Sequence, residues 1–135
     1  MNREGTTVFI EDDSMWIERV LKRDGALCVV PATFNTKLEN WAAVMNRTEE
    51  MGLDIPETVR GRVWDVILVD GPKGWLDQHP GRVKSIFQAV QLVTDGGSIF
   101  VHDCRREVES ACCDRFLGGM LVIGEVARLR HYKSN

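Results

Sequence analysis

The sequence predicts an α/β domain built on a parallel sheet, and three observations support this fold class. Short apolar segments alternate with segments of helical periodicity, which is the pattern of β-α-β units. The run Val66–Val69 is apolar throughout, as in parallel strands that are buried on both faces. It ends at Asp70, and Gly71-Pro72 then forces a turn. We therefore expect helices on both faces of the sheet.

Length, composition and charge fit one ordinary globular domain over residues 1–135. The hydrophobic fraction of 44% is enough for a core. A net charge of −3 with scattered basic residues gives no case for a nucleic-acid partner. No apolar segment approaches the ~20 residues that span a bilayer, and the N-terminal residues lack the apolar core of a signal peptide.

The N-terminal half begins with a short apolar strand. A helix follows it, with Asp13 or Ser14 as its cap and Gly25 as its stop. Its apolar positions recur at helical spacing and form one face, consisting of Trp16, Ile17, Val20 and Leu21. The expected elements are strands at 7–10 and 26–30, a helix at 14–25, a largely helical stretch at 35–52 and a loop at 53–62.

The C-terminal half repeats the alternation. A strand at 64–69 leads into a long irregular connection, and the next helix has its inward positions at helical spacing before Gly96-Gly97 stops it. A second apolar strand then ends on His102-Asp103. The expected elements are a connection at 74–82, helices at 82–97 and 106–119, a strand at 99–101 and two closing strands within 120–132, for which an antiparallel pairing is one arrangement.

The four cysteines show neither a disulfide framework nor zinc-ligand spacing. Cys112 and Cys113 are adjacent and cannot easily bridge each other. We expect four free thiols, most of them buried.

Three predicted strands end in an acidic residue: Glu11, Asp70 and Asp103. In a parallel sheet these ends share one edge, where ligands of α/β proteins bind. The alternative is that such acids only cap turns or the helices that follow. The two roles are compatible, so the sequence predicts a polar ligand site at this edge.

Several motifs resemble those of one known family. They are TVFIEDDSMWI, FNTKL, WDVILVDGPKGW, PGRVKSIFQAV, IFVHDCRREVE and RLRHY. Their order and spacing resemble the glucuronoxylan 4-O-methyltransferase family of plants over nearly the whole chain. The resemblance implies an S-adenosylmethionine-dependent methyltransferase of the Golgi with a Rossmann-like sheet. It also implies a polysaccharide substrate that bears uronic acid, methylated on the 4-hydroxyl of glucuronic acid in xylan or a similar glycan.

The resemblance assigns cofactor and catalytic roles to the acidic strand ends. Glu11 would bind the ribose hydroxyls of the cofactor, and Asp70 would lie against the cofactor and the acceptor hydroxyl as general base. Asp70 and Asp103 could instead hold a magnesium-like or manganese-like ion. His102, catalytic with Asp70 and Asp103, is a second candidate base. A strand-end histidine satisfied by a backbone carbonyl is the alternative for His102.

Three further residues are candidates for binding the acceptor. Lys73 and Arg82 could bind the carboxylate of a uronic acid, and Trp75 could stack on a sugar face. Alternatively, the two cations are solvated loop charges, Arg82 is a structural anchor to carbonyls or to an acid such as Glu107, and Trp75 is a core or hinge residue.

The chain departs from the family pattern at its start. Residues 1–7 are too short for the first strand and the Gly-rich loop of the cofactor site, so we expect the C-terminal portion of a methyltransferase-like domain. Two halves of the sheet would then lack a partner between them. Alternatively, residues 8–30 and 64–102 close directly into a smaller sheet. A non-catalytic α/β protein that binds glycan or assembles with biosynthetic enzymes is the alternative function.

Overall fold

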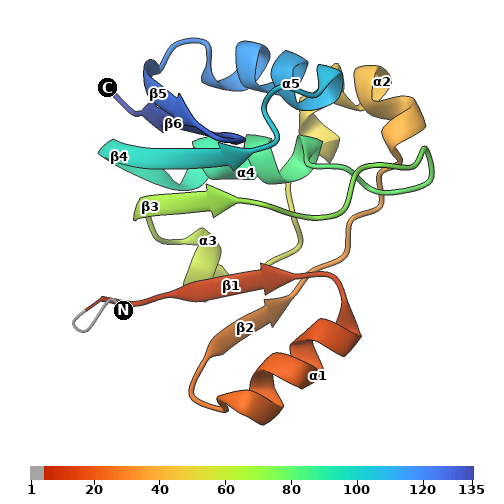
Figure 1. The fold of residues 1–135 in the computed structure, drawn as a ribbon. Helices are drawn as coiled ribbons and strands as arrows, with labels where there is room; N and C mark the ends of the chain where they lie inside the picture. Colours follow the sequence, from red (N-terminus) through yellow and green to blue (C-terminus); the bar gives the residue numbers. More distant parts are fainter. Residues whose placement is uncertain (1–4) are drawn as a thin grey trace.

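The structure is a computed structural model that describes residues 5–135 (Figure 1). Residues 1–4 lie outside this range. The prediction that the start of the chain is too short for a further strand concerns these residues in part, and that part lies outside the described residues. The strands are β1 (Val8–Glu11), β2 (Cys28–Pro31), β3 (Trp64–Val69), β4 (Val93–His102), β5 (Leu121–Val126) and β6 (Leu129–Lys133). The helices are α1 (Ser14–Arg23), α2 (Trp41–Met45), α3 (Glu57–Arg60), α4 (Val83–Leu92) and α5 (Glu107–Leu117), with 3₁₀ turns η1 (Leu38–Asn40) and η2 (Thr48–Glu50).

The strands form two sheets, which confirms the predicted α/β class. β1 and β2 pair in parallel, and a second sheet has the order β3-β4-β6-β5. β3 and β4 are parallel, whereas β6 is antiparallel to β4 and β5. Between the described strands β1 and β3 there is no hydrogen-bonded pairing, so the two edges face each other unpaired (Figure 1). The smaller, directly closed sheet is therefore not formed.

The main core lies on one face of the four-stranded sheet. Val69, Ile99 and Val101 are buried there. They pack in one cluster with residues of α4 and α5, such as Ile86 and Leu117. This packing removes large aliphatic side chains from water and stabilises the sheet that carries the site.

The prediction that β3 is buried on both faces is wrong. Val66 and Leu68 are 64% and 61% exposed, on the face of the sheet opposite α4 and α5. β3 is an edge strand, and no helix in residues 5–135 covers this face of it. The unbroken apolar run therefore predicts the position of the strand correctly, but it does not predict which faces of the strand are buried.

The N-terminal half differs in detail from the expected elements. Asp13 caps α1 as expected, because its Oδ1 accepts hydrogen bonds from the backbone N–H groups of Met15 and Trp16. The expected apolar face of α1 is only partly used, since Trp16 and Leu21 are 55% and 39% exposed. Residues 35–52 break into η1, α2 and η2, and α3 forms within the predicted loop.

The Gly-Gly pair does not stop α4, which already ends at Leu92. β4 begins at Val93 and contains both glycines. Gly96 has a φ of +68°, and a Cβ on Gly97 would lie 2.8 Å from the carbonyl oxygen of Thr94. The pairing of β3 with β4 shifts register here, between Trp64 and Val66. The glycines therefore allow a bulge at the start of the strand.

The last part of the chain matches its prediction. β5 and β6 form an antiparallel pair, and β6 also extends the sheet beyond β4. Within residues 5–135, no helix combines the length and apolar character needed to cross a membrane.

Candidate functional site

Asp70 and His102 meet where β3 and β4 end. The parallel register pairs Val69 with Val101, so the next residue of each strand lies side by side. Nδ1 of His102 is 3.0 Å from Oδ1 of Asp70 and 3.5 Å from Oδ2 of Asp103. Nδ1 is buried without an aligned hydrogen-bond partner among the described residues, so these contacts reflect proximity and charge. Asp70 itself is 65% exposed and open to solvent.

Arg82 fixes the two strand ends relative to each other. Its Nη2 donates to the backbone carbonyl of Asp70 over 2.9 Å, and its Nη1 donates to that of His102 over 3.4 Å. Nη1 also lies 3.2 Å from Asp103 and 3.3 Å from Glu109. The Arg82 side chain is 5% exposed. Its geometry is that of the structural anchor considered above, with Glu109 rather than Glu107 as the acidic partner.

Asp103 is held by arginines on several sides. Besides Arg82, Nη2 of Arg106 lies 2.8 Å and Nη1 of Arg128 lies 3.4 Å from its carboxylate. Its φ of +61° turns the chain sharply after β4. Burial alone would raise the pKa of Asp103. The hydrogen bond from Arg82 and the charges of Arg106, His102 and Arg82 outweigh burial and lower that pKa.

These surroundings do not fit the metal ion considered for Asp70 and Asp103. A divalent cation would have to displace or face the guanidinium groups of Arg82, Arg106 and Arg128 at the Asp103 carboxylate. No group of three or more His, Cys, Asp or Glu side chains in residues 5–135 is arranged so that it could hold a metal ion. The arrangement is that of a buried ion cluster.

The connection from Asp70 to Arg82 folds back on itself. A Cβ on Gly74 would lie 3.1 Å from Cα of Gly81, so the two backbones approach as closely as glycines allow. The N–H of Gly81 donates to the carbonyl of Lys73 over 3.0 Å. Thr36 donates through its hydroxyl to the carbonyl of Pro80 over 3.0 Å. The loop is therefore pinned at several points.

Lys73 and Trp75 stand on the outer side of this pinned loop. Lys73 is exposed, and Trp75 is 63% exposed and contacts the ring of His79 edge-on at 4.8 Å. Both side chains can reach a ligand at the cleft, in contrast to Arg82. The sequence also allowed Trp75 to be a core residue, but a core residue would not be so exposed.

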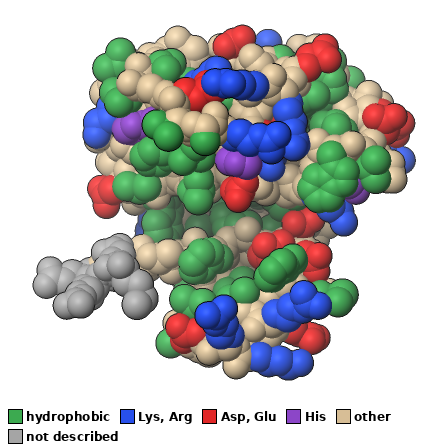
Figure 2. Space-filling model, in the orientation of Figure 1, with side chains coloured by type: hydrophobic (Ala, Val, Ile, Leu, Met, Phe, Trp, Pro, Cys, Tyr) green, Lys and Arg blue, Asp and Glu red, His purple; other side chains and the backbone are tan. Residues whose placement is uncertain are grey.

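A cleft of about 900 Å³ separates the two sheets, and its hollow is visible across the middle of Figure 2. Glu11 lines one wall, whereas Asp70, Lys73 and Trp75 line the other. The volume is within the usual range of small-molecule sites. The structure thus brings Glu11, Asp70, Lys73 and Trp75 to one cleft, whereas Arg82, His102 and Asp103 do not line it. Arg82 and Asp103 are buried.

The residues at the end of β1 fit a ligand that donates hydrogen bonds. Glu11 accepts the N–H groups of Asp12 and Asp13 on its Oε1, both over 2.9 Å, which holds its carboxylate at the rim. Such a fixed carboxylate suits the ribose diol of the expected S-adenosylmethionine. Burial raises the pKa of Asp12, and the neighbouring Glu11 raises it further, while the charge of Lys73 lowers it. This effect of Lys73 on Asp12 is an interaction across the cleft.

Sequence reasoning missed three members of the ion cluster: Glu109, Arg106 and Arg128. Glu109 is 1% exposed inside α5, although the motif that contains it predicts no role for it. A glutamate on the inner face of a helix otherwise lined by cysteines and leucine was the available signal. Arg128 carried no such signal, because its partner Asp103 is distant in sequence, whereas Arg106 lies only three residues after Asp103.

Comparison with known proteins gives relatives over nearly all of the chain. The family model IRX15/IRX15L/GXM matches residues 50–132. Glucuronoxylan 4-O-methyltransferase 2 of Arabidopsis thaliana is 34% identical over 98% of this chain and 53% of its own length. From the same plant, arabinogalactan O-methyltransferase 2 and protein IRREGULAR XYLEM 15 are each 31% identical over 98% of this chain, covering 54% and 49% of those proteins.

The matched region contains the part of the site at the ends of β3 and β4, but not Glu11. It extends from before β3 to the last strand and includes Asp70, His102, Asp103 and the arginines around them. The chain spans about half the length of the curated relatives that it matches. By the family model and the identity over its length, the chain belongs to the IRX15/IRX15L/GXM family, which includes polysaccharide O-methyltransferases.

Proposed function

We propose that the protein carrying this chain is an S-adenosylmethionine-dependent O-methyltransferase that acts on glucuronic acid residues of a xylan-type polysaccharide. The observation that supports it most is the contact of His102 with Asp70, because Asp70 lines a cleft that Glu11 lines from the other side. Following the family resemblance, we extend the proposal to the Golgi as the site of activity.

His102 is the general base of the proposal, and Asp70 orients it. The Asp70 carboxylate lies 3.0 Å from Nδ1, and a small rotation of the His102 ring that aligns an N–H with it favours the tautomer that carries its proton on that nitrogen. Nε2 is then the proton acceptor for a sugar hydroxyl. Asp70 also stabilises the imidazolium that forms. In the simpler alternative, the exposed Asp70 takes the proton directly, which its solvent access permits.

The cofactor supplies a methyl group on a sulfonium, which an acceptor oxygen can take in a single displacement. Glu11 binds the ribose hydroxyls of the cofactor, and Asp70 lies at the opposite wall of the cleft. Lys73 attracts the carboxylate of the uronic acid, and Trp75 offers its exposed ring to the sugar. Holding both reactants at fixed walls contributes to the rate by orientation.

The alternative is a non-catalytic, glycan-binding or assembly protein of polysaccharide biosynthesis. One relative, protein IRREGULAR XYLEM 15, has a name that states no methyl transfer. The ion cluster around Arg82 would then serve only the stability of a binding surface.

The test is incubation of the purified protein with S-adenosylmethionine labelled in its methyl group and a glucuronic-acid-bearing xylo-oligosaccharide. We expect label in the sugar as a 4-O-methyl ether, and transfer that is about ten-fold slower when a carboxyl-reduced acceptor replaces the acid. Saturable binding of the oligosaccharide with no label transferred would refute the enzyme and favour the non-catalytic alternative.

A further inference from the structure

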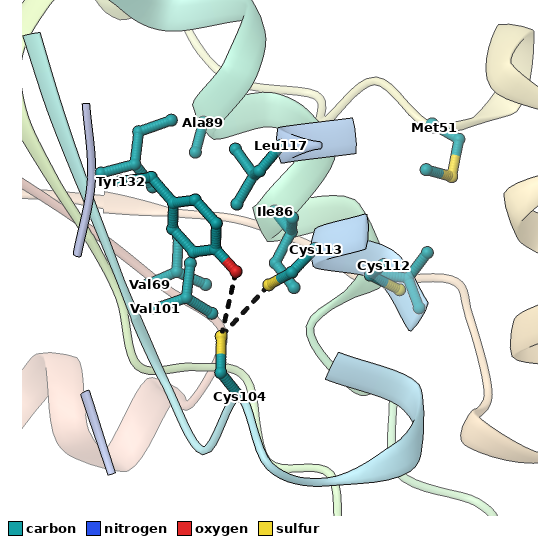
Figure 3. Packing of buried hydrophobic residues seen from close by; sticks show 12 residues of the cluster. Met51, Val69, Ile86, Ala89, Val101, Cys104, Cys112, Cys113, Leu117 and Tyr132 are labelled. Carbon is teal, nitrogen blue, oxygen red and sulfur yellow. Dashed lines mark hydrogen bonds between the residues drawn. The ribbon is translucent and has the colours of Figure 1, made fainter. Parts of the chain in front are cut away.

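Two buried thiols lie in contact beside the ion cluster, and the proposed chemistry uses neither. Sγ of Cys104 is 3.2 Å from Sγ of Cys113 (Figure 3). Cys104 lies in the turn after β4, and Cys113 lies within α5. Each residue is 1% exposed. We propose that Cys104 and Cys113 are an oxidisable pair that forms a disulfide bond between this turn and α5.

The structure selects this pair from the four cysteines. Cys112, the sequence neighbour of Cys113, points away from Cys104 (Figure 3). Its Sγ lies 3.4 Å from Sδ of Met45. Cys28 is exposed on β2, in the other sheet. A one-residue difference in α5 therefore decides which thiol can meet Cys104.

The same contact determines which thiol attacks first. The hydrogen bond with Cys113 lowers the pKa of Cys104, and although burial opposes this, the hydrogen bond with Tyr132 and the charge of Arg130 lower it further. The hydrogen bond to Cys104 and burial both raise the pKa of Cys113. Cys104 is thus the more readily ionised of the two thiols, so we assign the first attack to Cys104 and the resolving step to Cys113.

The reaction is exchange with a small disulfide, for which oxidised glutathione is the probe. The Cys104 thiolate bonds to one glutathione sulfur, the glutathione disulfide breaks, and one glutathione leaves. Cys113 then loses its proton, its sulfur bonds to Cys104, and the second glutathione leaves with the bonding electrons of the mixed disulfide. Two protein thiols are oxidised, and one glutathione disulfide is reduced to two glutathiones.

The bond would fasten the turn that carries Asp103 to the helix that carries Glu109. Both acids bind Arg82, so the crosslink supports the ion cluster from behind. It closes a ring of ten residues, from Cys104 to Cys113. Loop-closure entropy for such a ring predicts a rise in Tm of roughly 5–15 °C for a domain of this size.

The test begins with the whole chain unfolded in denaturant, so that burial does not limit access, and refolded in a glutathione redox buffer. Free thiols are then blocked and the protein is digested with trypsin. We expect one crosslink, between the peptides that contain Cys104 and Cys113, and full reversal by dithiothreitol. Cys28→Ala serves as the background because it removes the exposed thiol.

Matched variants separate the pair from its neighbour. In this background, Cys112→Ala should keep the crosslink and the rise in Tm, whereas Cys113→Ala should lose both. Recovery of Cys104 and Cys113 as blocked free thiols in the refolded Cys112→Ala protein would overturn the proposal. A crosslink that survives Cys113→Ala, or an oxidised form that melts no higher than the reduced one, would also overturn it.

Discussion

Arg82 and Glu109 form a buried ion pair behind the candidate site. Nη1 of Arg82 lies 3.3 Å from Oε1 of Glu109, and their side chains are 5% and 1% exposed. The same guanidinium donates to the backbone carbonyls of Asp70 and His102. A contact between α5 and the residue that precedes α4 therefore holds the ends of β3 and β4 in place.

Arg82→Ala should lower the free energy of unfolding by about 3–5 kcal/mol, because it leaves buried carboxylates without their cation. Arg82→Lys should lower the free energy of unfolding by a smaller amount, because the charge is kept but one ammonium group cannot replace the planar guanidinium at four acceptors. Urea denaturation measures both. Arg60→Ala is the matched control, because its ion pair with Glu57 is exposed and such pairs contribute about 0–1 kcal/mol.

This role of Arg82 has a kinetic consequence. Arg82→Lys should reduce turnover on uronic-acid and neutral acceptors in equal proportion, because it disturbs the site rather than one substrate group. An Arg82→Ala protein as stable as the Arg60→Ala control, with a loss confined to uronic-acid acceptors, would instead make Arg82 the carboxylate ligand that the sequence also allowed.

Asp103→Asn should destabilise the protein at neutral pH by about 3 kcal/mol, because three arginines lose a buried partner. The folded-state pKa of Asp103 lies below its ordinary value of 3.8. Its stabilising effect is therefore present above that pH and is lost as the pH falls through the folded-state pKa. The unfolding free energies of both proteins should converge as the pH falls below the folded-state pKa of Asp103, and a constant difference at all pH values would contradict this account.

Asp12→Asn should have the opposite effect. The folded-state pKa of Asp12 is raised, chiefly by burial and then by Glu11, so its ionised form opposes folding at neutral pH. The substitution should raise Tm by about 1–3 °C at pH 7, with the gain disappearing at acidic pH, where wild-type Asp12 is protonated. The exposed Asp54→Asn is the control. An equal or lower Tm for Asp12→Asn at pH 7 would disprove the interpretation.

Lys73→Met should lower kcat/KM about ten-fold for a glucuronic-acid-bearing oligosaccharide, because a charged hydrogen bond of about 1.5 kcal/mol is lost. The carboxyl-reduced acceptor should be affected much less. Lys22→Met, on the exposed side of α1, is the matched control. An equal fall in kcat/KM on both acceptors would show that Lys73 does not bind the carboxylate of the acceptor. Trp75→Ala should lower kcat/KM for both acceptors by the same factor, because stacking of the ring on a sugar requires no charge.

Elements with strong local signals could be predicted from the sequence. The apolar run Trp64–Val69, the periodic helices α4 and α5 and the closing strand pair all follow from hydrophobic spacing. The meeting of Asp70 with His102 also followed, because adjacent parallel strands end at one edge.

The remaining features depend on contacts that no local pattern encodes. Residues 35–52 have helical spacing, but their backbone is pinned to the loop at 77–80, as by the bond from the N–H of Leu38 to the carbonyl of His79 over 2.7 Å. The sequence predicts that the glycines after α4 stop the helix, although tertiary pairing with β3 makes them a bulge. The sequence predicts Arg82 as a ligand of a uronic acid or as a loop charge or anchor, and it could not specify the anchor because the four acceptors lie just after β3, at and just after the end of β4, and on α5.

The most direct test of the central claim is the methyl-transfer rate of His102→Gln and Asp70→Asn, each measured with the dissociation constant for S-adenosylmethionine. We expect both variants to lose about 10²–10⁴ in turnover, as removal of a general base or its orienting acid does, with cofactor affinity near wild type. His131→Gln, which alters a histidine on β6, should stay within a few-fold of wild type. If His102→Gln and Asp70→Asn also stay within a few-fold, the strand-end pair is not the catalytic base.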